Sequence, residues 1–297
     1  MLDGIMKNRS ISGIQTGLIA FFLAVSSLSY SQYTVKCDLK FISHLVNRGD
    51  YNEALYLTDS TACSSLQSND SINYFRGWSL YSLKRLSASS VSLLKVTPVS
   101  GFYLKSHYFA AYNYAYSGDY ESSLKTLSEI VQVNDKQISL TNFEAAGIYL
   151  LQGDTARYRE SFSKIRRGLY EITESTDNLQ KISDDLKIHK FKSPVVAGIL
   201  SGIIPGSGKF YSGKRGEAIS AFIGTTGLGL VTLENYRKSG LRSFKTIIFG
   251  TAFAFTYVAN IYGAVMTVNI IETEYRDNVK NSILFNLHIP LRNTFDK

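Results

Sequence analysis

The chain has 297 residues, enough for two domains, with 44% hydrophobic residues and a formal net charge of +8 at pH 7. Its mean hydropathy of -0.04 is that of an ordinary globular protein, although this average hides apolar and polar regions. The basic residues are dispersed along the chain, which argues against a nucleic-acid partner.

The first residues predict an export signal. Lys7 and Arg9 precede an apolar run over residues 11–28, and Ser29 and Ser31 then form the small-x-small pattern of a cleavage site. We therefore expect residues 1–31 to be a signal peptide that is removed on export. The alternative is an uncleaved N-terminal anchor, which the length of the run favours and its glycine and polar residues disfavour.

The two cysteines, Cys37 and Cys63, predict a disulfide. An exported chain meets an oxidising compartment, and both residues stand nearly the same distance from Gly49, the expected turn of a helical hairpin. The bridge would close a loop worth ~3 kcal/mol; two separately buried thiols are the alternative. The four histidines are scattered and neither cysteine has a neighbouring ligand, so no metal site or other cofactor is expected.

Residues 32–170 are expected to form a helical repeat domain. The sequence at residues 49–51 returns at 118–120 and in part at 153–155, at separations of 69 and 35 residues. These separations fit a unit of about 34 residues, with a missing turn near residues 83–85. Before each later turn a small residue is followed three positions on by a larger one: Gly77 with Leu80, Ala111 with Tyr114, and Ala146 with Tyr149.

This pattern resembles the tetratricopeptide repeat (TPR) family, in which antiparallel helix pairs stack into a right-handed solenoid. The resemblance covers about residues 34–170 and is best in residues 108–130. There the family's small residue falls on Ala111 and its aromatic residue on Tyr114, whereas its usual alanine in the second helix is replaced by Ser123. The resemblance implies an all-α, TPR-like solenoid of helical hairpins with an extended concave surface.

Residues 164–192 have the pattern of one long amphipathic helix, with apolar residues at steps of three, four or seven. We expect residues 171–192 to be a linker helix that caps the solenoid and leads into a membrane. A sustained coiled coil is the less consistent alternative, because Thr176 interrupts the apolar seam.

Residues 193–271 predict a membrane module with two transmembrane helices, at residues 217–233 and 246–271. The loop between them contains Arg237, Lys238, Arg242 and Lys245, and short basic loops stay cytoplasmic. The resulting hairpin leaves a C-terminal tail, residues 272–297, on the side of the repeats. This topology requires residues 195–211 to re-enter without a net crossing; a full crossing is the alternative and would place the basic loop outside.

A motif in residues 204–214 resembles the Pro-Gly-x-Gly-x-Phe-Tyr-x-Gly signature of small bacterial membrane modules and, more distantly, the TM2 domain. This resemblance implies membrane residence without an assigned activity. A phosphate-binding loop is excluded, because its first glycine and the Ser or Thr after the lysine are missing. The motif residues are Pro205, Gly206, Gly208, Phe210, Tyr211 and Gly213.

The sequence contains no recognisable combination of nucleophile, base and oxyanion donor, so we expect no enzyme. The leading hypothesis is a membrane-anchored adaptor in the inner membrane of a bacterium. It contacts lipid and presents its repeats to a peptide or protein partner on the periplasmic side. The candidate partner-binding residues lie on one aromatic helix: Tyr103, Tyr108, Tyr112 and Tyr116.

The alternative function is a membrane assembly or transport component whose helical module is active and whose repeats regulate it. An intramembrane carboxylate would favour this role, because buried charge in a membrane is usually functional. None is present in residues 218–233 or 246–271.

Overall fold

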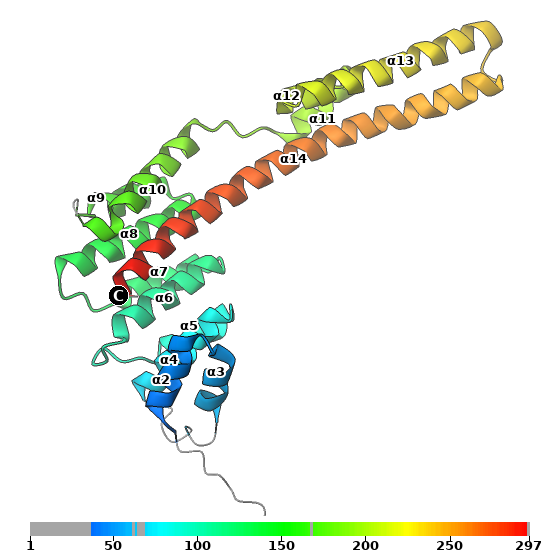
Figure 1. The fold of residues 1–297 in the computed structure, drawn as a ribbon. Coiled ribbons are helices and arrows are strands. Elements are labelled where there is room, and N and C mark those ends of the chain that lie inside the picture. Colours follow the sequence, from blue (N-terminus) through cyan, green and yellow to red (C-terminus); the bar gives the residue numbers. More distant parts are fainter. Residues whose placement is uncertain (1–36, 61–62, 64–68, 167–168, 296–297) are drawn as a thin grey trace, which may run out of the picture. The chain divides into compact units, whose positions relative to one another are not determined.

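The computed structural model describes residues 37–60, 63, 69–166 and 169–295 (Figure 1). The predicted export signal, residues 1–31, lies outside the described residues. Within them the regular secondary structure is helical and contains no strand, which confirms the all-α class. The chain divides into two compact units, Met1–Phe102 and Tyr103–Lys297.

The first unit contains two helical hairpins. Helix α2 (Leu39–Arg48) packs on α3 (Tyr51–Asp59), and α4 (Asp70–Ser82) packs on α5 (Leu86–Leu93). Helix α3 also packs on α4, so the two hairpins are in contact.

The second unit begins with two further hairpins. Helix α6 (Tyr103–Tyr116) packs on α7 (Tyr120–Glu129), and α8 (Asp135–Gln152) packs on α9 (Thr155–Ser163). Helix α7 packs on α8 and joins these hairpins to each other.

The turns of the four hairpins share one backbone conformation. Gly49, Lys84, Gly118 and Gly153 all have positive φ, at 87°, 62°, 85° and 76°. In each case the N–H of the following residue is donated to the carbonyl oxygen five positions earlier, as from Asp119 to Tyr114 at 2.9 Å. This left-handed C-terminal turn satisfies helix carbonyl groups that would otherwise be unpaired. The turn predicted near residues 83–85 is therefore present, with a lysine where the other turns have glycine.

In two hairpins a buried serine of the second helix makes a hydrogen bond to the first helix. Ser123 donates its hydroxyl to the carbonyl oxygen of Ala111 at 2.6 Å, and Ser89 donates to Gly77 at 2.8 Å. Both serines are fully buried. A hydroxyl is compatible with this close contact because it donates a hydrogen bond to a carbonyl oxygen.

Cys37 and Cys63 are joined by a disulfide, with their Cα atoms 5.0 Å apart. Cys37 lies just before α2 and Cys63 just after α3, at the open end of the first hairpin. The bridge closes a loop with a sequence separation of 26, which stabilises a short two-helix element by restricting its unfolded state.

The amphipathic segment is shorter than the sequence predicts. Helix α9 ends at Ser163, and the next helix, α10, covers only Tyr170–Ile188. Residues 189–193, called the linker below, are not helical and lead into Pro194. The helix predicted over residues 164–192 is therefore too long at both ends, and α10 does not continue into the apolar module.

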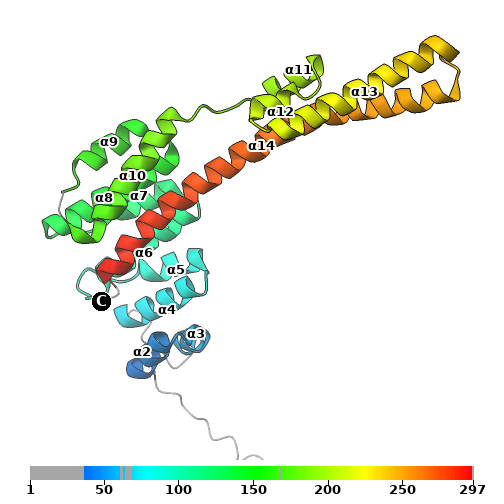
Figure 2. The ribbon, with the colours of Figure 1, turned by 45° about the horizontal axis from the view of Figure 1, so that its top comes forward.

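The C-terminal module contains four helices: α11 (Pro194–Ile203), α12 (Ser207–Ser212), α13 (Arg215–Ser239) and α14 (Phe244–Phe295). Helices α13 and α14 run side by side as an antiparallel hairpin in both views (Figures 1 and 2). Both are long and apolar enough, by length and composition, to cross a membrane. Their apolar windows are only 11% buried within the protein, so most of this surface faces outward.

Helix α14 extends far beyond the predicted transmembrane segment. Its 52 residues correspond to about 78 Å, and they include almost the whole of the expected C-terminal tail. Residues 272–295 are therefore not a separate tail. They continue the helix into contact with α6, α8 and α10 (Figure 2).

Candidate functional site

The four candidate partner-binding tyrosines lie on α6, but the structure gives them different environments. Tyr103, Tyr108 and Tyr112 are buried, with exposed fractions of 8% or less. Tyr116, near the end of the helix, is 52% exposed.

The C-terminal part of α14 covers two of these tyrosines. The ring of Tyr108 lies 5.7 Å from that of Phe295, and the ring of Tyr112 stacks on His288 at 5.0 Å. The face of α6 that the sequence suggests for a partner therefore holds the protein's own helix. We call residues 276–295 the docked segment of α14.

At Gly147 of α8 the docked segment approaches closely. A Cβ atom at this position would lie 2.4 Å from a methyl carbon of Leu287, so only glycine fits the present geometry. Leu287 and Leu291 are fully buried, and Leu284 is 3% exposed. This spacing places the apolar face of the docked segment against the repeats.

Polar contacts link α10 to the docked segment and α6 to α8. Asn178 of α10 donates its side-chain amide to the side-chain oxygen of Asn286 at 3.1 Å. On α8, Thr141 and the hydroxyl of Tyr108 form a hydrogen bond of 2.7 Å, and the same hydroxyl donates to the carbonyl oxygen of Gln137.

Glu144, one turn after Thr141, is buried in this region. Its Oε1 has no hydrogen-bond partner among the described residues. Burial raises the pKa of this carboxyl well above its usual value, because no nearby positive charge offsets the loss of water. Burial therefore favours the neutral form of this side chain.

A second set of contacts ties the linker to α14. Glu272 accepts hydrogen bonds from the backbone N–H of Lys192 at 3.0 Å and from Nε2 of His189 at 3.1 Å. The imidazole of His189 stacks on Tyr275, with ring centroids 3.7 Å apart. Glu272 is 8% exposed, so its carboxylate is largely enclosed by these partners.

The environment lowers the pKa of Glu272. Burial, the largest single influence, acts in the opposite direction, but the hydrogen bonds from Lys192 and His189 and the nearby positive charges together outweigh it. The carboxylate is thus held in its charged form at the point where the linker meets α14.

The Pro-Gly motif forms a tight turn between α11 and α12. Gly206 has φ 86°, and a Cβ there would lie 2.2 Å from the carbonyl oxygen of Ala218 in α13. A Cβ on Gly208 would lie 2.0 Å from the carbonyl oxygen of Ala197 in α11. Both glycines are therefore needed for backbone-to-backbone contact.

Side chains satisfy the backbone groups at this turn. The N–H of Gly206 is donated to Oδ1 of Asn260, and that of Gly208 to Oγ of Ser201. The hydroxyl of Tyr257 is donated to the carbonyl oxygen of Gly202. Such pairing is what a non-helical backbone needs in an apolar environment.

The segment from α11 to α12 reverses direction beside α14. Gly198 and Gly202 approach Val265 and Ile261 of α14 in turn, so α11 runs antiparallel to α14. The chain then reverses, and a Cβ on Gly213 would lie 3.9 Å from Nζ of Lys192. The beginning and end of the segment are thus neighbours.

The two aromatic residues of the motif have different roles. Tyr211 packs on a small core of Ala197, Ala264 and Val268, and its hydroxyl accepts a hydrogen bond from the N–H of Ser193. Phe210 is 59% exposed, with the guanidinium of Arg215 6.0 Å from its ring centre. Tyr211 therefore closes the segment, whereas Phe210 faces outward.

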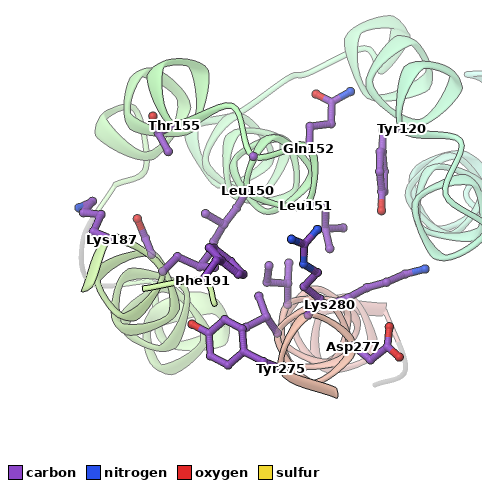
Figure 3. A pocket seen from close by; sticks show the side chains of 16 residues that line it. Tyr120, Leu150, Leu151, Gln152, Thr155, Lys187, Phe191, Tyr275, Asp277 and Lys280 are labelled. Atoms are coloured by element: carbon purple, nitrogen blue, oxygen red, sulfur yellow. The ribbon is translucent and has the colours of Figure 1, made fainter. Parts of the chain in front are cut away.

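A groove of about 550 Å³ lies beside the docked segment, between α8, α10, the linker and α14 (Figure 3). Leu150 of α8 and Phe191 of the linker point toward a common space that Tyr275 of α14 also borders. Lys187 and Lys280 contribute basic groups to its lining.

No family model matches the chain, and searches of curated proteins and of solved structures also gave no match. Within the described residues, no group of three or more His, Cys, Asp and Glu side chains is placed to hold a metal ion.

Sequence reasoning missed the docking of α14. A signal was present, because Ile283, Leu284, Leu287 and Leu291 repeat at helical spacing after the apolar span. A tail at residues 272–297 is expected only if the helix ends where the apolar run ends, and α14 continues beyond that point.

We expect Gly147→Val to loosen the docked segment, since a branched side chain would overlap Leu287. Overpacking of this kind costs about 1–3 kcal/mol. Trypsin should then cleave faster after Arg276, Lys280 and Arg292, and Leu287→Ala should restore part of the protection. Gly101→Val is the control, because a Cβ at Gly101 meets nothing within 4 Å. Unchanged cleavage in the Gly147 variant would contradict the contact.

We expect Glu272→Gln to lower the stability at pH 7 by about 1.5–3 kcal/mol, the value of hydrogen bonds to a charged group. Because the folded-state pKa of Glu272 is lowered, its contribution is present above the unfolded pKa and is lost as the pH falls through the folded pKa. Unfolding in detergent should therefore show a gap between wild type and variant at pH 7 that shrinks in acid. The exposed neighbour Glu274→Gln should show little change, and a gap that is independent of pH would refute the assignment.

Proposed function

We propose that the protein is a membrane-anchored, non-catalytic adaptor that presents a TPR-like repeat domain outside the cytoplasm. The observation that carries this proposal is the continuity of α14. One helix belongs both to the exposed apolar hairpin and to the buried core of the second unit. The hairpins of the second unit are thereby joined to the membrane module by one continuous helix.

Membrane residence is supported by the exposed apolar surface of α13 and α14. Large apolar side chains that face outward include Ile219, Phe222, Ile223, Leu230, Ile247, Phe255 and Val258. A surface of this size is costly in water, whereas a bilayer would cover it. Residues 246–271 would cross about 39 Å, more than the ~30 Å of the hydrocarbon layer.

The proposed topology has both helices crossing once and the motif segment re-entering. Tyr257, whose hydroxyl bonds Gly202 of α11, lies ~21 Å along α14 from Ile271. This distance is less than the thickness of the hydrocarbon layer. With the basic loop in the cytoplasm, the linker and the repeats lie on the opposite side, which would be the periplasm of a bacterium.

The TPR-like assignment is supported by the recurring turns and by the serine bonds of the hairpins. The left-handed turns at residues 49, 84, 118 and 153 recur every 34 or 35 residues, and the bonds from Ser89 and Ser123 recur after 34. Stacked units with this period are typical of helical solenoids, whose surfaces bind peptides.

A partner would meet the repeats where the docked segment leaves them accessible. Tyr116 is the exposed member of the four tyrosines, and an exposed aromatic is a frequent anchor in protein interfaces. Tyr108 and Tyr112 would become available only if the docked segment moved away.

Single cysteines at Ser163, Ser239 and Asn293, with Cys37 and Cys63 replaced, test the topology. All three positions are exposed in the structure. In cells whose outer membrane has been made permeable and whose inner membrane is intact, an impermeant maleimide should label the first and last positions and leave Ser239 unlabelled. Labelling at Ser239 would show that the motif segment spans the membrane, and protection at Ser163 would reject an external repeat domain.

A photo-crosslinking residue in place of Tyr116 tests the adaptor role. We expect a defined protein adduct from native membranes at this position and none with the same probe at Tyr112, which α14 covers. Adducts at Tyr112 alone would indicate that a partner displaces the docked segment. The absence of protein adducts from both positions would favour the alternative role, in which the membrane module is the active part.

A further inference from the structure

The groove of Figure 3 lies close to the proposed membrane boundary. Its α14 lining begins at Tyr275 and ends at Ile283, which is ~6 to ~18 Å beyond Ile271. The headgroup layer occupies roughly the first 5–8 Å outside the hydrocarbon. The end of the groove formed by Phe191 and Tyr275 therefore lies at headgroup level, where aromatic side chains are favoured.

The inner wall of the groove is apolar. Leu150, Leu186 and Ile283 line it from α8, α10 and α14; Leu186 is partly exposed, whereas Leu150 and Ile283 are buried. The volume of about 550 Å³ is within the range of sites that hold a small ligand. Such a wall suits an alkyl chain better than a polar solute.

The rim of the groove is basic. Lys187, Arg276 and Lys280 line it together with one acidic residue, Asp277. Lys187 is paired with Asp184 at 2.8 Å. By contrast, neither Arg276 nor Lys280 has a carboxylate within salt-bridge distance in the described part of the chain, and the guanidinium of Arg276 rests 4.9 Å from the ring centre of Phe191. Two cations thus remain available beside an apolar wall.

We propose that this groove binds an anionic phospholipid from the surrounding bilayer. The phosphate lies between Arg276 and Lys280, where a guanidinium forms paired hydrogen bonds to its oxygens. One acyl chain lies along Leu186 and Phe191 and runs toward the bilayer. This inference rests on the membrane placement proposed above, and it adds a lipid whose head group joins α14 to the linker.

The test uses the full-length protein in phosphatidylcholine vesicles that contain a small fraction of phosphatidylglycerol with a photoactivatable acyl chain. Labelled peptides should map to the groove, around residues 183–191. Arg276→Glu with Lys280→Glu should lower this labelling about tenfold, the factor that corresponds to 1.4 kcal/mol. Arg276→Lys with Lys280→Arg keeps both charges and should retain most of it.

The matched control is Lys95→Glu with Lys125→Glu, which makes the same charge change at exposed lysines away from the groove. Its groove labelling should equal that of wild type. Equal labelling in the Arg276 and Lys280 charge-reversal variant, or equal labelling by a phosphatidylcholine probe, would overturn the proposal. Loss of labelling in the charge-conserving variant would do the same.

Two further outcomes separate this inference from the proposed function. Competition by inorganic phosphate in solution would assign the groove to a soluble anion and overturn the lipid source. Protein that fails to insert into the vesicles would reject the membrane placement together with the lipid. Inserted protein without groove labelling would reject the lipid alone.

Discussion

The contact between Gly147 and Leu287 is the constraint on which the second unit depends. This close approach allows α14 to pack on α8 as a continuous helix. One part of the helix therefore has an outward-facing apolar surface, and another part lies in a buried core. A helix satisfies its own backbone groups wherever it lies, and this property allows the transition without an irregular segment. A larger residue at position 147 would push α14 away, and the apolar face of residues 283–291 would then lose its cover.

The irregular backbone of this module occurs next to α14, and its polar groups are paired there. The linker is held by Glu272, and the motif turn by Asn260, both on α14. Since an unpaired backbone group costs most where water is excluded, these side chains explain how a chain reversal is compatible with an apolar setting. The same helix thereby fixes the position of α10, through Asn286, and of α11 and α12. Movement of α14 along its axis would disturb all of these contacts together.

Local sequence patterns predicted the local structure well and the long-range packing poorly. The Gly-Asp turns, the missing turn at residues 83–85 and the Cys37–Cys63 pair follow from spacing, because hairpin geometry depends on near neighbours. The sequence does not predict the bond from Ser123 to Ala111, because a serine at this position is only a departure from the TPR pattern until the facing carbonyl group is known. The docking of α14 on Tyr108 and Tyr112 involves residues more than 170 positions apart, and no local pattern specifies such a pairing. For the same reason the groove between α8, α10 and α14 had no signal in the sequence.

The docked segment also changes how a partner for the repeats must be understood. A helix attached to the same unit competes with any external peptide at a high effective concentration, so a weak ligand cannot displace it from Tyr108 and Tyr112. A partner that did so would have to stabilise the released state by more than the packing of Leu284, Leu287 and Leu291 contributes, several kcal/mol at ~1.5–3 kcal/mol for each buried side chain. A partner that binds beside Tyr116 bears no such cost. The aromatic face of α6 is therefore best understood as the surface on which α14 packs, so that α14 joins the hairpins of the second unit to the apolar helices.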